Sequence, residues 1–173
     1  MRLFIAIETS AEILKDLVEI QRKINMRGIS VSSHPHLTLK FLGEAEPEKI
    51  IEKLKAISFT KFELTITEIG FFPNVSSPRV IYAGINDSTE LIDLQNKINE
   101  STSEIKQDHP FKGHMTLARV KFYKNKAAMK AKINSVKLKR LKFPVTEFKL
   151  KRSELKPTGP QYTDLAIFPA KDL

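Results

Sequence analysis

Apolar and polar residues alternate along the chain with two different periods, and the period changes from segment to segment. Alternation at every second residue is typical of a half-buried strand, and apolar residues three and four positions apart are typical of a helix. Four helices are predicted, beginning after Ser10, at Pro47, after Asp87 or Ser88, and after Asn125, because these residues favour helix starts. Extended segments are predicted at 2–8, 29–32, 36–42 (ended by Gly43), 62–71, 79–85, 114–120, 143–155 and 162–168.

Two of the predicted strands begin with the same short phrase. His36-Leu37-Thr38-Leu39 returns as His114-Met115-Thr116-Leu117. Within each phrase His and Thr share one face of the strand, and Leu or Met lies on the other. The order strand–helix–strand also occurs in both halves. We therefore predict an α+β fold, a single domain over residues 1–173 made of two duplicated lobes, with one phrase from each lobe facing a shared groove.

Length and composition indicate an ordinary globular protein. A chain of 173 residues fits one domain. The chain contains no cysteine, which excludes disulfides, thiolate nucleophiles and thiolate metal sites. No apolar run approaches the ~20 residues of a membrane span, so we expect no membrane association and a cytoplasmic location.

The net charge of +9 is concentrated in one segment. Between Lys112 and Lys156 there are 15 Lys and Arg against two acids, whereas the rest of the chain holds 14 bases and 18 acids. Such asymmetry indicates a polyanionic partner, since phosphate contacts supply most sequence-independent affinity for nucleic acids. The alternative is a solvated basic surface, such as the lysine-rich surface of a heat-stable protein. The histidine phrases favour an anionic substrate, which Lys112–Lys156 would help to hold.

All four histidines of the chain lie in or just before the two phrases. A pair of imidazoles can hold opposite protonation states near pH 7, so one can take a proton from water while the other gives one to a leaving oxygen. His36 and His114 are the candidates for this role, and the Thr38 and Thr116 hydroxyls could donate to phosphate oxygens. The two remaining histidines, His34 and His109, are interpreted as structural or peripheral.

Other chemistries find less support in the sequence. A zinc site of four histidines would require both loops to fold inward, and no carboxylate lies beside either phrase, so we predict neither metal nor cofactor. The patterns GxxxxGK[ST], GxGxxG and GxSxG are missing. Their absence argues against P-loop nucleotide hydrolases, dinucleotide-dependent enzymes and serine hydrolases of the nucleophile-elbow type.

With both phrases and their flanks considered, the chain resembles the 2H phosphoesterase superfamily. Within it, the chain is most similar to the RNA 2',3'-cyclic phosphodiesterases formerly described as 2'-5' RNA ligases. The chain departs from the family pattern at two places. Lys112-Gly113 stands where the family often has a residue pair that ends in Pro, and Met115 stands where the family usually has Leu or Val. The resemblance rests on residues 1–6, 36–43, 70–73, 78–80, 110–120, 153–155, Gly159, Pro160 and Tyr162.

The resemblance implies a bilobal α+β fold, with two pseudo-symmetric lobes of antiparallel sheet and outer helices around a central groove. It implies metal-independent hydrolysis of a 2',3'-cyclic phosphate at an RNA end to a 2'-phosphomonoester. His36 would match the proton donor to the departing 3' oxygen, and His114 the acceptor that activates water. Thr38 and Thr116 would match phosphate-binding threonines. Arg119 would lie near the substrate base or phosphate, with a salt bridge at the strand end as the alternative.

The expected partner is RNA with a cyclic phosphate end, such as a tRNA fragment, and the expected state is a monomer. Phe41, Phe111 and Tyr162 could stack on a base, but we expect core packing for each. Two other functions stay open. One is ligation of a cyclic phosphate end to a 5'-hydroxyl at the same site, and the other is a non-catalytic RNA-binding module.

Overall fold

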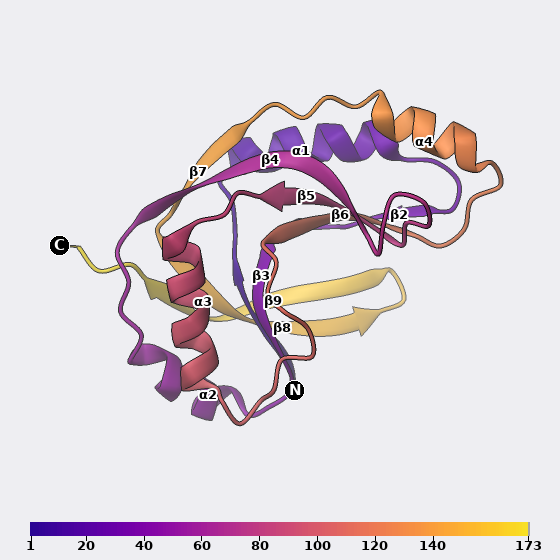
Figure 1. The fold of residues 1–173 in the computed structure, drawn as a ribbon. Helices are drawn as coiled ribbons and strands as arrows, with labels where there is room; N and C mark the ends of the chain where they lie inside the picture. Colours follow the sequence, from indigo (N-terminus) through magenta and orange to yellow (C-terminus); the bar gives the residue numbers. More distant parts are fainter. Residues whose placement is uncertain (173) are drawn as a thin grey trace.

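Nine strands and four helices form over residues 1–172, the part of the chain described by the computed structural model (Figure 1). The helices are α1 (Ala11–Ile24), α2 (Pro47–Lys55), α3 (Thr89–Ser101) and α4 (Lys126–Asn134). The strands are β1 (Arg2–Ile7), β2 (Ile29–Val31), β3 (Leu37–Glu44), β4 (Phe62–Phe72), β5 (Val80–Ile85), β6 (His114–Val120), β7 (Leu141–Val145), β8 (Glu147–Lys156) and β9 (Gly159–Pro169). No helix in this range is long and apolar enough to cross a membrane.

The predicted helix starts are confirmed. The Ser10 hydroxyl accepts a hydrogen bond from the Ile13 amide at the start of α1, and the Ser88 hydroxyl accepts one from Leu91 at the start of α3. The Asn125 side chain caps α4 in the same way. These side chains satisfy amides that have no partner within the first turn of a helix. Pro47 occupies the first turn of α2, where its missing N–H costs nothing.

Three strand predictions need correction. The strand predicted over 162–168 begins three residues earlier, as β9 over Gly159–Pro169. β3 does not end at Gly43, because it continues to Glu44 with Gly43 at a φ of 65°, a backbone conformation that glycine adopts without strain. The single strand predicted over 143–155 is wrong. It is divided at Thr146 into β7, which pairs with β4, and β8, which pairs with β1 and β9. The buried positions change from odd-numbered (Phe143, Val145) to even-numbered (Phe148, Leu150) across Thr146, a phase break that the prediction of one strand overlooked.

The strands form one antiparallel sheet in the order β7-β4-β5-β6-β3-β1-β8-β9, with β2 also pairing to β6. β7 lies at one end of this order and β8 near the other, yet only Thr146 separates them. The Cα atoms of Val145 and Glu147 are therefore within about 7.6 Å of each other. The sheet must curl strongly to bring its two ends together, which gives the curved shape seen in Figure 1. The predicted α+β class is confirmed.

The two motif strands, β3 and β6, lie in the middle of the sheet and pair through Leu37 and Met115. Outward from the centre, β3 is followed by β1, β8 and β9, and β6 is followed by β5, β4 and β7. The helices are exchanged between these halves. α1, which follows β1, packs against β6, and α3, which follows β5, packs against β3. The two halves thus cover each other's motif strand; their origin by duplication stays a prediction.

A pair of buried glutamines fixes this exchange. Each motif strand is bulged after its threonine, so that Leu39 and Leu117 have no register partner in the neighbouring strand. The side-chain amide of Gln21 on α1 donates to the Leu117 carbonyl at 2.8 Å and to the Ser32 carbonyl at 2.7 Å. Gln95 on α3 donates to the Leu39 carbonyl at 3.4 Å. Each glutamine therefore satisfies the bulge of the other half.

Replacing either glutamine by leucine should destabilise the protein. Gln21→Leu and Gln95→Leu keep the approximate side-chain volume but remove hydrogen-bond donors, at a cost of roughly 1–3 kcal/mol each. Gln95→Leu removes the side-chain donor to the Leu39 carbonyl, and Gln21→Leu removes the donor to the Ser32 carbonyl and one of the two donors to the Leu117 carbonyl, which keeps the Ser32 amide. The free energy of unfolding, measured by urea denaturation, should fall accordingly. Gln161→Leu, on the exposed part of β9, is the control and should change it by less than about 0.5 kcal/mol. Unfolding curves that match wild type for both buried variants would contradict this role.

Candidate active site

The predicted site residues meet on one face of the sheet, on both sides of the β3–β6 contact. Antiparallel register through Leu37 and Met115 sets His36 opposite Thr116, and Thr38 opposite His114. Residues opposite each other in such a pair have Cα atoms about 5 Å apart. Leu37 and Met115 are fully buried on the helix side, so the two His and two Thr lie on the other side. We call this side the histidine face.

Both imidazoles are held in the same way. His36 Nδ1 lies 2.8 Å from the carbonyl oxygen of His34, and His114 Nδ1 lies 2.7 Å from the carbonyl oxygen of Lys112. A carbonyl can only accept, so Nδ1 must carry the hydrogen in both rings. The Nε2 atom is therefore the one that takes up and releases a proton. Each ring presents this atom for acid or base chemistry in a fixed orientation.

Aromatic side chains pack against each imidazole. The His36 ring stacks on Phe4 with centroids 5.1 Å apart and meets the Tyr162 ring edge-on at 5.1 Å. His114 meets the Phe72 ring edge-on at 5.0 Å and the Tyr82 ring at 5.4 Å. These rings come from β1, β9, β4 and β5, so the neighbouring strands of both halves contribute. Their packing restricts the imidazoles to one rotamer and removes part of their hydration.

Lys112 and Gly70 hold Tyr82 in its place beside His114. The Lys112 ammonium donates to the Tyr82 hydroxyl at 3.1 Å and lies 5.5 Å from the ring centroids of both Phe72 and Tyr82. A Cβ atom at Gly70 would lie only 2.2 Å from the Tyr82 ring. The ring therefore lies directly over the glycine, in a space that any larger residue would fill.

Burial lowers the pKa of both His36 and His114 below the ordinary value of 6.5, because it disfavours the charged form. The hydrogen bond to the backbone carbonyl opposes this in each ring. The nearby charges differ. Lys112 and Arg119, both cationic, lower the pKa of His114 further, whereas His36 has Lys151 and His34 acting to lower its pKa and Glu8 acting to raise it.

Arg119 is exposed on β6 opposite Val80 of β5. Val80 is also opposite Phe72 of β4, whose ring contacts His114. Residues opposite each other share a face of the sheet, so Arg119 lies on the histidine face, with Val80 between it and Phe72. The alternative of a salt bridge at the strand end is not observed, since Arg119 forms no ion pair with a carboxylate of residues 1–172. Its guanidinium is available to an anionic ligand.

Several features of this face were not expected from the sequence. The expectation of core packing is wrong for Phe41, which is 71% exposed, and for Tyr162, whose ring packs against Phe4 and His36. It is confirmed for Phe111, which packs against the core. The sequence shows no carboxylate beside either phrase, but the fold brings Glu8 to 3.4 Å from His34 Nε2. These neighbours come from other strands, and no pattern within the phrases indicates them.

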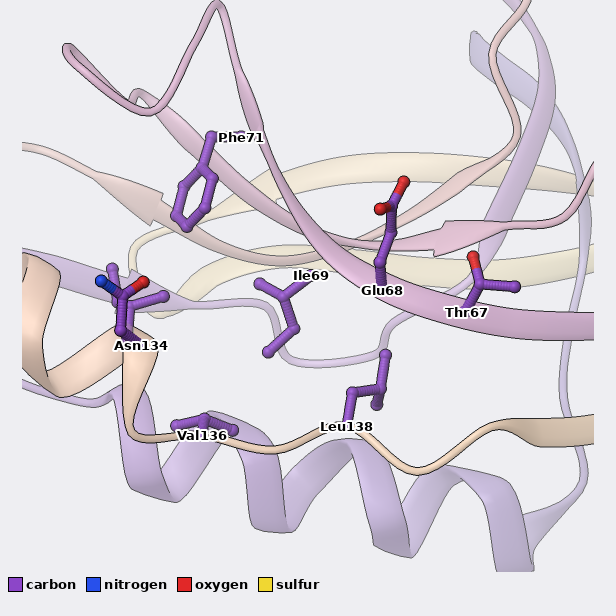
Figure 2. Close-up of a pocket in the computed structure, with 8 residues that line it drawn as sticks. Thr67, Glu68, Ile69, Phe71, Asn134, Val136 and Leu138 are labelled. Atoms are coloured by element: carbon purple, nitrogen blue, oxygen red, sulfur yellow. The ribbon is translucent and has the colours of Figure 1, made fainter.

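Two pockets on the surface lie apart from the histidine face. One pocket of about 280 Å³ lies between β4 and the segment that follows α4, lined by Ile69, Val136 and Leu138 among others (Figure 2). A second lies near Phe59 and the start of α3. Neither includes a residue of the two phrases. Within residues 1–172, no group of three or more His, Asp and Glu is arranged to hold a metal ion.

Comparison with known proteins gives a consistent result. A family model described as the 2'-5' RNA ligase superfamily matches residues 15–156. The RNA 2',3'-cyclic phosphodiesterase of Archaeoglobus fulgidus is 33% identical over 97% of this chain and 99% of its own length. The protein of that name from Thermus thermophilus is 36% identical over 97% and 89%.

Solved structures share the whole fold. The crystal structure of the Thermus thermophilus protein TT0787 has a TM-score of 0.81 at 33% identity, covering 98% of this chain and 97% of that one. That of E. coli LigT complexed with 3'-AMP has a TM-score of 0.80 at 26% identity, covering 99% and 98%.

Gly70→Ala should disturb the half of the site that contains His114. The added Cβ would overlap the Tyr82 ring, and such overpacking typically costs about 1–3 kcal/mol. Thermal unfolding should occur at a lower temperature, and the His114 ring signals should move in NMR spectra while those of His36 stay in place. Gly43→Ala on β3 is the control, because its Cβ would meet nothing within 4 Å, and its φ of 65° strains alanine without touching Tyr82. It should leave the His114 signals in place. An unchanged His114 signal in Gly70→Ala would refute the packing role.

Proposed function

The chain belongs to the 2'-5' RNA ligase superfamily, and on this basis we propose that it is an RNA 2',3'-cyclic phosphodiesterase that works by acid–base catalysis between His36 and His114. The observation that carries the proposal is the matched support of the two imidazoles. Both have Nδ1 engaged by the carbonyl two residues earlier, and both leave Nε2 for proton transfer.

The reaction follows from this arrangement. Nε2 of His114 takes a proton from water, whose oxygen attacks the phosphorus of the cyclic phosphate. The bond from phosphorus to the 3' oxygen breaks, and that oxygen receives the proton held on Nε2 of His36. The products are a 2'-phosphomonoester and a 3'-hydroxyl. The Thr38 and Thr116 hydroxyls and the Arg119 guanidinium would hold the non-bridging oxygens as charge develops on them.

The charges around the rings are compatible with these roles. The cations Lys112 and Arg119 favour a neutral His114, as a general base requires. The negative charge of a bound phosphodiester raises the pKa of a neighbouring imidazole and so favours the protonated His36 that the leaving oxygen needs. In this mechanism the proton transfers are carried by side chains, with neither metal nor cofactor.

Ligation is the second candidate, favoured by the name of the matching family. In that reaction the 5'-hydroxyl of another RNA takes the place of water. Its oxygen attacks the phosphorus, its proton goes to His114, and the 3' oxygen leaves with the proton of His36, which forms a 2'-5' phosphodiester. Product analysis with two RNA halves separates the two reactions. Processing of tRNA fragments, a monomeric state and a cytoplasmic location stay predictions.

Only part of the basic segment Lys112–Lys156 has lysines without acidic neighbours in the sequence. Near its end, Lys149 and Lys151 pair with Glu8 and Asp164. Between Lys112 and Thr146 there is no acidic residue. This stretch leads from the histidine face through α4 and then alongside α1 and β4 to β7 (Figures 1 and 2). We propose that the body of the RNA lies along this strip. The exposed basic side chains of this strip include Lys121, Lys124, Lys126, Lys137, Lys139 and Arg140.

Alanine at either histidine should abolish most of the activity. His36→Ala and His114→Ala should each lower kcat/KM by roughly 10²–10⁴ on an RNA that ends in a 2',3'-cyclic phosphate, assayed with a chelator present. His109→Ala, in an exposed loop, is the control and should retain wild-type turnover. The product should carry a 2'-phosphate. Full activity in either phrase variant, or RNA binding without turnover by the wild type, would contradict the proposal.

The basic strip should matter for long substrates and not for short ones. The triple variant Lys124→Gln, Lys126→Gln, Lys137→Gln should raise KM for an oligonucleotide with a cyclic phosphate end. The salt dependence of its binding should fall by about one unit of slope for each phosphate that the variant no longer neutralises. Turnover of 2',3'-cyclic AMP should stay at the wild-type level.

The matched control removes three lysines from the α2 side of the molecule, with Lys49→Gln, Lys55→Gln and Lys61→Gln. It should leave both substrates unaffected. An equal loss on the long and the short substrate in the strip variant would show that these lysines act through the fold and not by contacting RNA.

A further inference from the structure

Four charged side chains form a compact cluster beside His36. The Lys149 ammonium lies 2.7 Å from a carboxylate oxygen of Glu8 and 2.9 Å from one of Asp164, and the Lys151 ammonium lies 2.6 Å from the other Asp164 oxygen and also pairs with Glu8. Both lysines thus contact both acids. Lys151 is only 3% exposed. We call these four residues the charge cluster.

Both acids and Lys149 are held in the charged form. Burial disfavours the carboxylates, but the hydrogen bonds from the two lysines outweigh it and keep the pKa of Glu8 and of Asp164 below their ordinary values. Burial likewise opposes the charge of Lys149, and its two acidic partners nevertheless raise its pKa. A buried ion-pair network is weak evidence for stability, since apolar side chains of similar size often serve as well. Its position beside a reactive ring points to another role.

Two structural links connect the charge cluster to His36. The Glu8 carboxylate lies 3.4 Å from His34 Nε2, and the carbonyl of the same His34 accepts the Nδ1 hydrogen bond of His36. On the other side, Lys151 is opposite Phe4 in the β1–β8 register, and the Phe4 ring stacks on His36. The cluster therefore supports both the residue that orients the imidazole and the ring on which it packs.

The other half of the sheet has no such cluster. By register, the position next to His114 that corresponds to Glu8 is Gly84, which is opposite His114. β4 takes the place in this half that β8 takes in the other. Gly70, opposite Tyr82, corresponds to Lys149, and Phe72, opposite Val80, corresponds to Lys151. Two glycines and a phenylalanine thus replace an acid and two lysines. The two imidazoles have equivalent backbone support but different electrostatic surroundings.

We propose that the charge cluster is a positioning device for His36, which anchors His34 through Glu8 and makes the charge around His36 different from that around His114. The proposal rests on the proposed function for its catalytic meaning, because His36 is the proton donor there. Glu8 and Lys151 do not contact the reacting atoms; they act through His34, Phe4 and the local electrostatic field.

Opposite charge changes in the cluster should move His36 in opposite directions. The groups that face His36 are Glu8 from the end of β1, His34 before β3, Lys151 with Lys149 from β8, and Tyr162 with Asp164 from β9. Glu8→Gln removes a negative charge and leaves Lys151 less compensated, so the protonated form of His36 becomes less favourable. Lys151→Met removes a positive charge and leaves the two acids in excess, so that form becomes more favourable.

The test is an NMR pH titration of the four histidine rings, assigned with His→Ala variants at each position. The pKa of His36 should fall in Glu8→Gln and rise in Lys151→Met, each by roughly 0.5–1 pH units, as expected for one charge a few ångströms away in a partly hydrated site. The pKa of His114 should stay at its wild-type value in both variants. Because His36 is the proton donor, the alkaline limb of the kcat/KM profile should move in the same direction as its pKa.

Two further variants complete the experiment. Lys149 is a more exposed member of the cluster than Lys151. Lys149→Met should also raise the pKa of His36, and it replaces Lys151→Met in the experiment if that variant does not fold. Glu154→Gln is the matched control, since it removes a carboxylate from the same β8–β9 hairpin where it pairs with Arg152, and it should leave His36 unchanged.

Shifts of the same sign in the acid and lysine variants, no shift in either, or an equal shift of His114 would overturn the proposal. The titration needs no turnover. Opposite shifts of His36 in a protein that does not hydrolyse cyclic phosphates would refute the proposed function and leave the role of the cluster standing.

Discussion

The pairing of β3 with β6 is the constraint on which the rest of the structure depends. It is a single register contact, between Leu37 and Met115, and it places two histidines from distant parts of the chain on one face. So short a contact would give little stability alone. Gln21 and Gln95 reinforce it, because each reaches from the helix of one half to the bulged strand of the other. At each bulge a carbonyl accepts a hydrogen bond from a glutamine of the opposite helix.

This arrangement makes the site symmetric in geometry and asymmetric in charge. Both imidazoles have Nδ1 held by a backbone carbonyl and both pack against two aromatic rings. A symmetric pair can share one proton, but symmetry does not decide which of the two rings carries it. The charged groups that act on the pKa of His114 are the cations Lys112 and Arg119, whereas the charge cluster places acids as well as lysines near His36. In the proposed mechanism, the assignment of acid and base would therefore depend on residues outside the two phrases.

The distribution of lysines follows from the same separation of roles. Lys149 and Lys151 on β8 are neutralised by Glu8, which follows β1, and by Asp164 on β9. Around α4 the lysines are exposed and have no acidic residue nearby in the sequence. Net charge does not distinguish these two groups. Only the paired carboxylates show that the first serves the protein itself, and the second is free to meet a polyanion.

The sequence by itself determined much of the local structure. Helix starts were predicted at Ser10, Ser88 and Asn125 because capping depends on residues three positions apart. Alternation within the two phrases predicted correctly which side chains share a face, since the period of a strand is local. The order of elements predicted the α+β class, and the two phrases predicted the histidine and threonine candidates. The family resemblance added Arg119 and the antiparallel arrangement, and Figure 1 shows that sheet with helices on its outside.

Only the tertiary structure decided what lies next to those residues. The division of one predicted strand at Thr146, the exposure of Phe41 and the approach of Glu8 to His34 all depend on which strands pair and in which register. Periodicity states that a side chain faces the interior or the solvent; it does not state which segment, 100 or more residues away, supplies the neighbour. Strand pairing and packing across the curled sheet make that choice, because they depend on the whole chain at once.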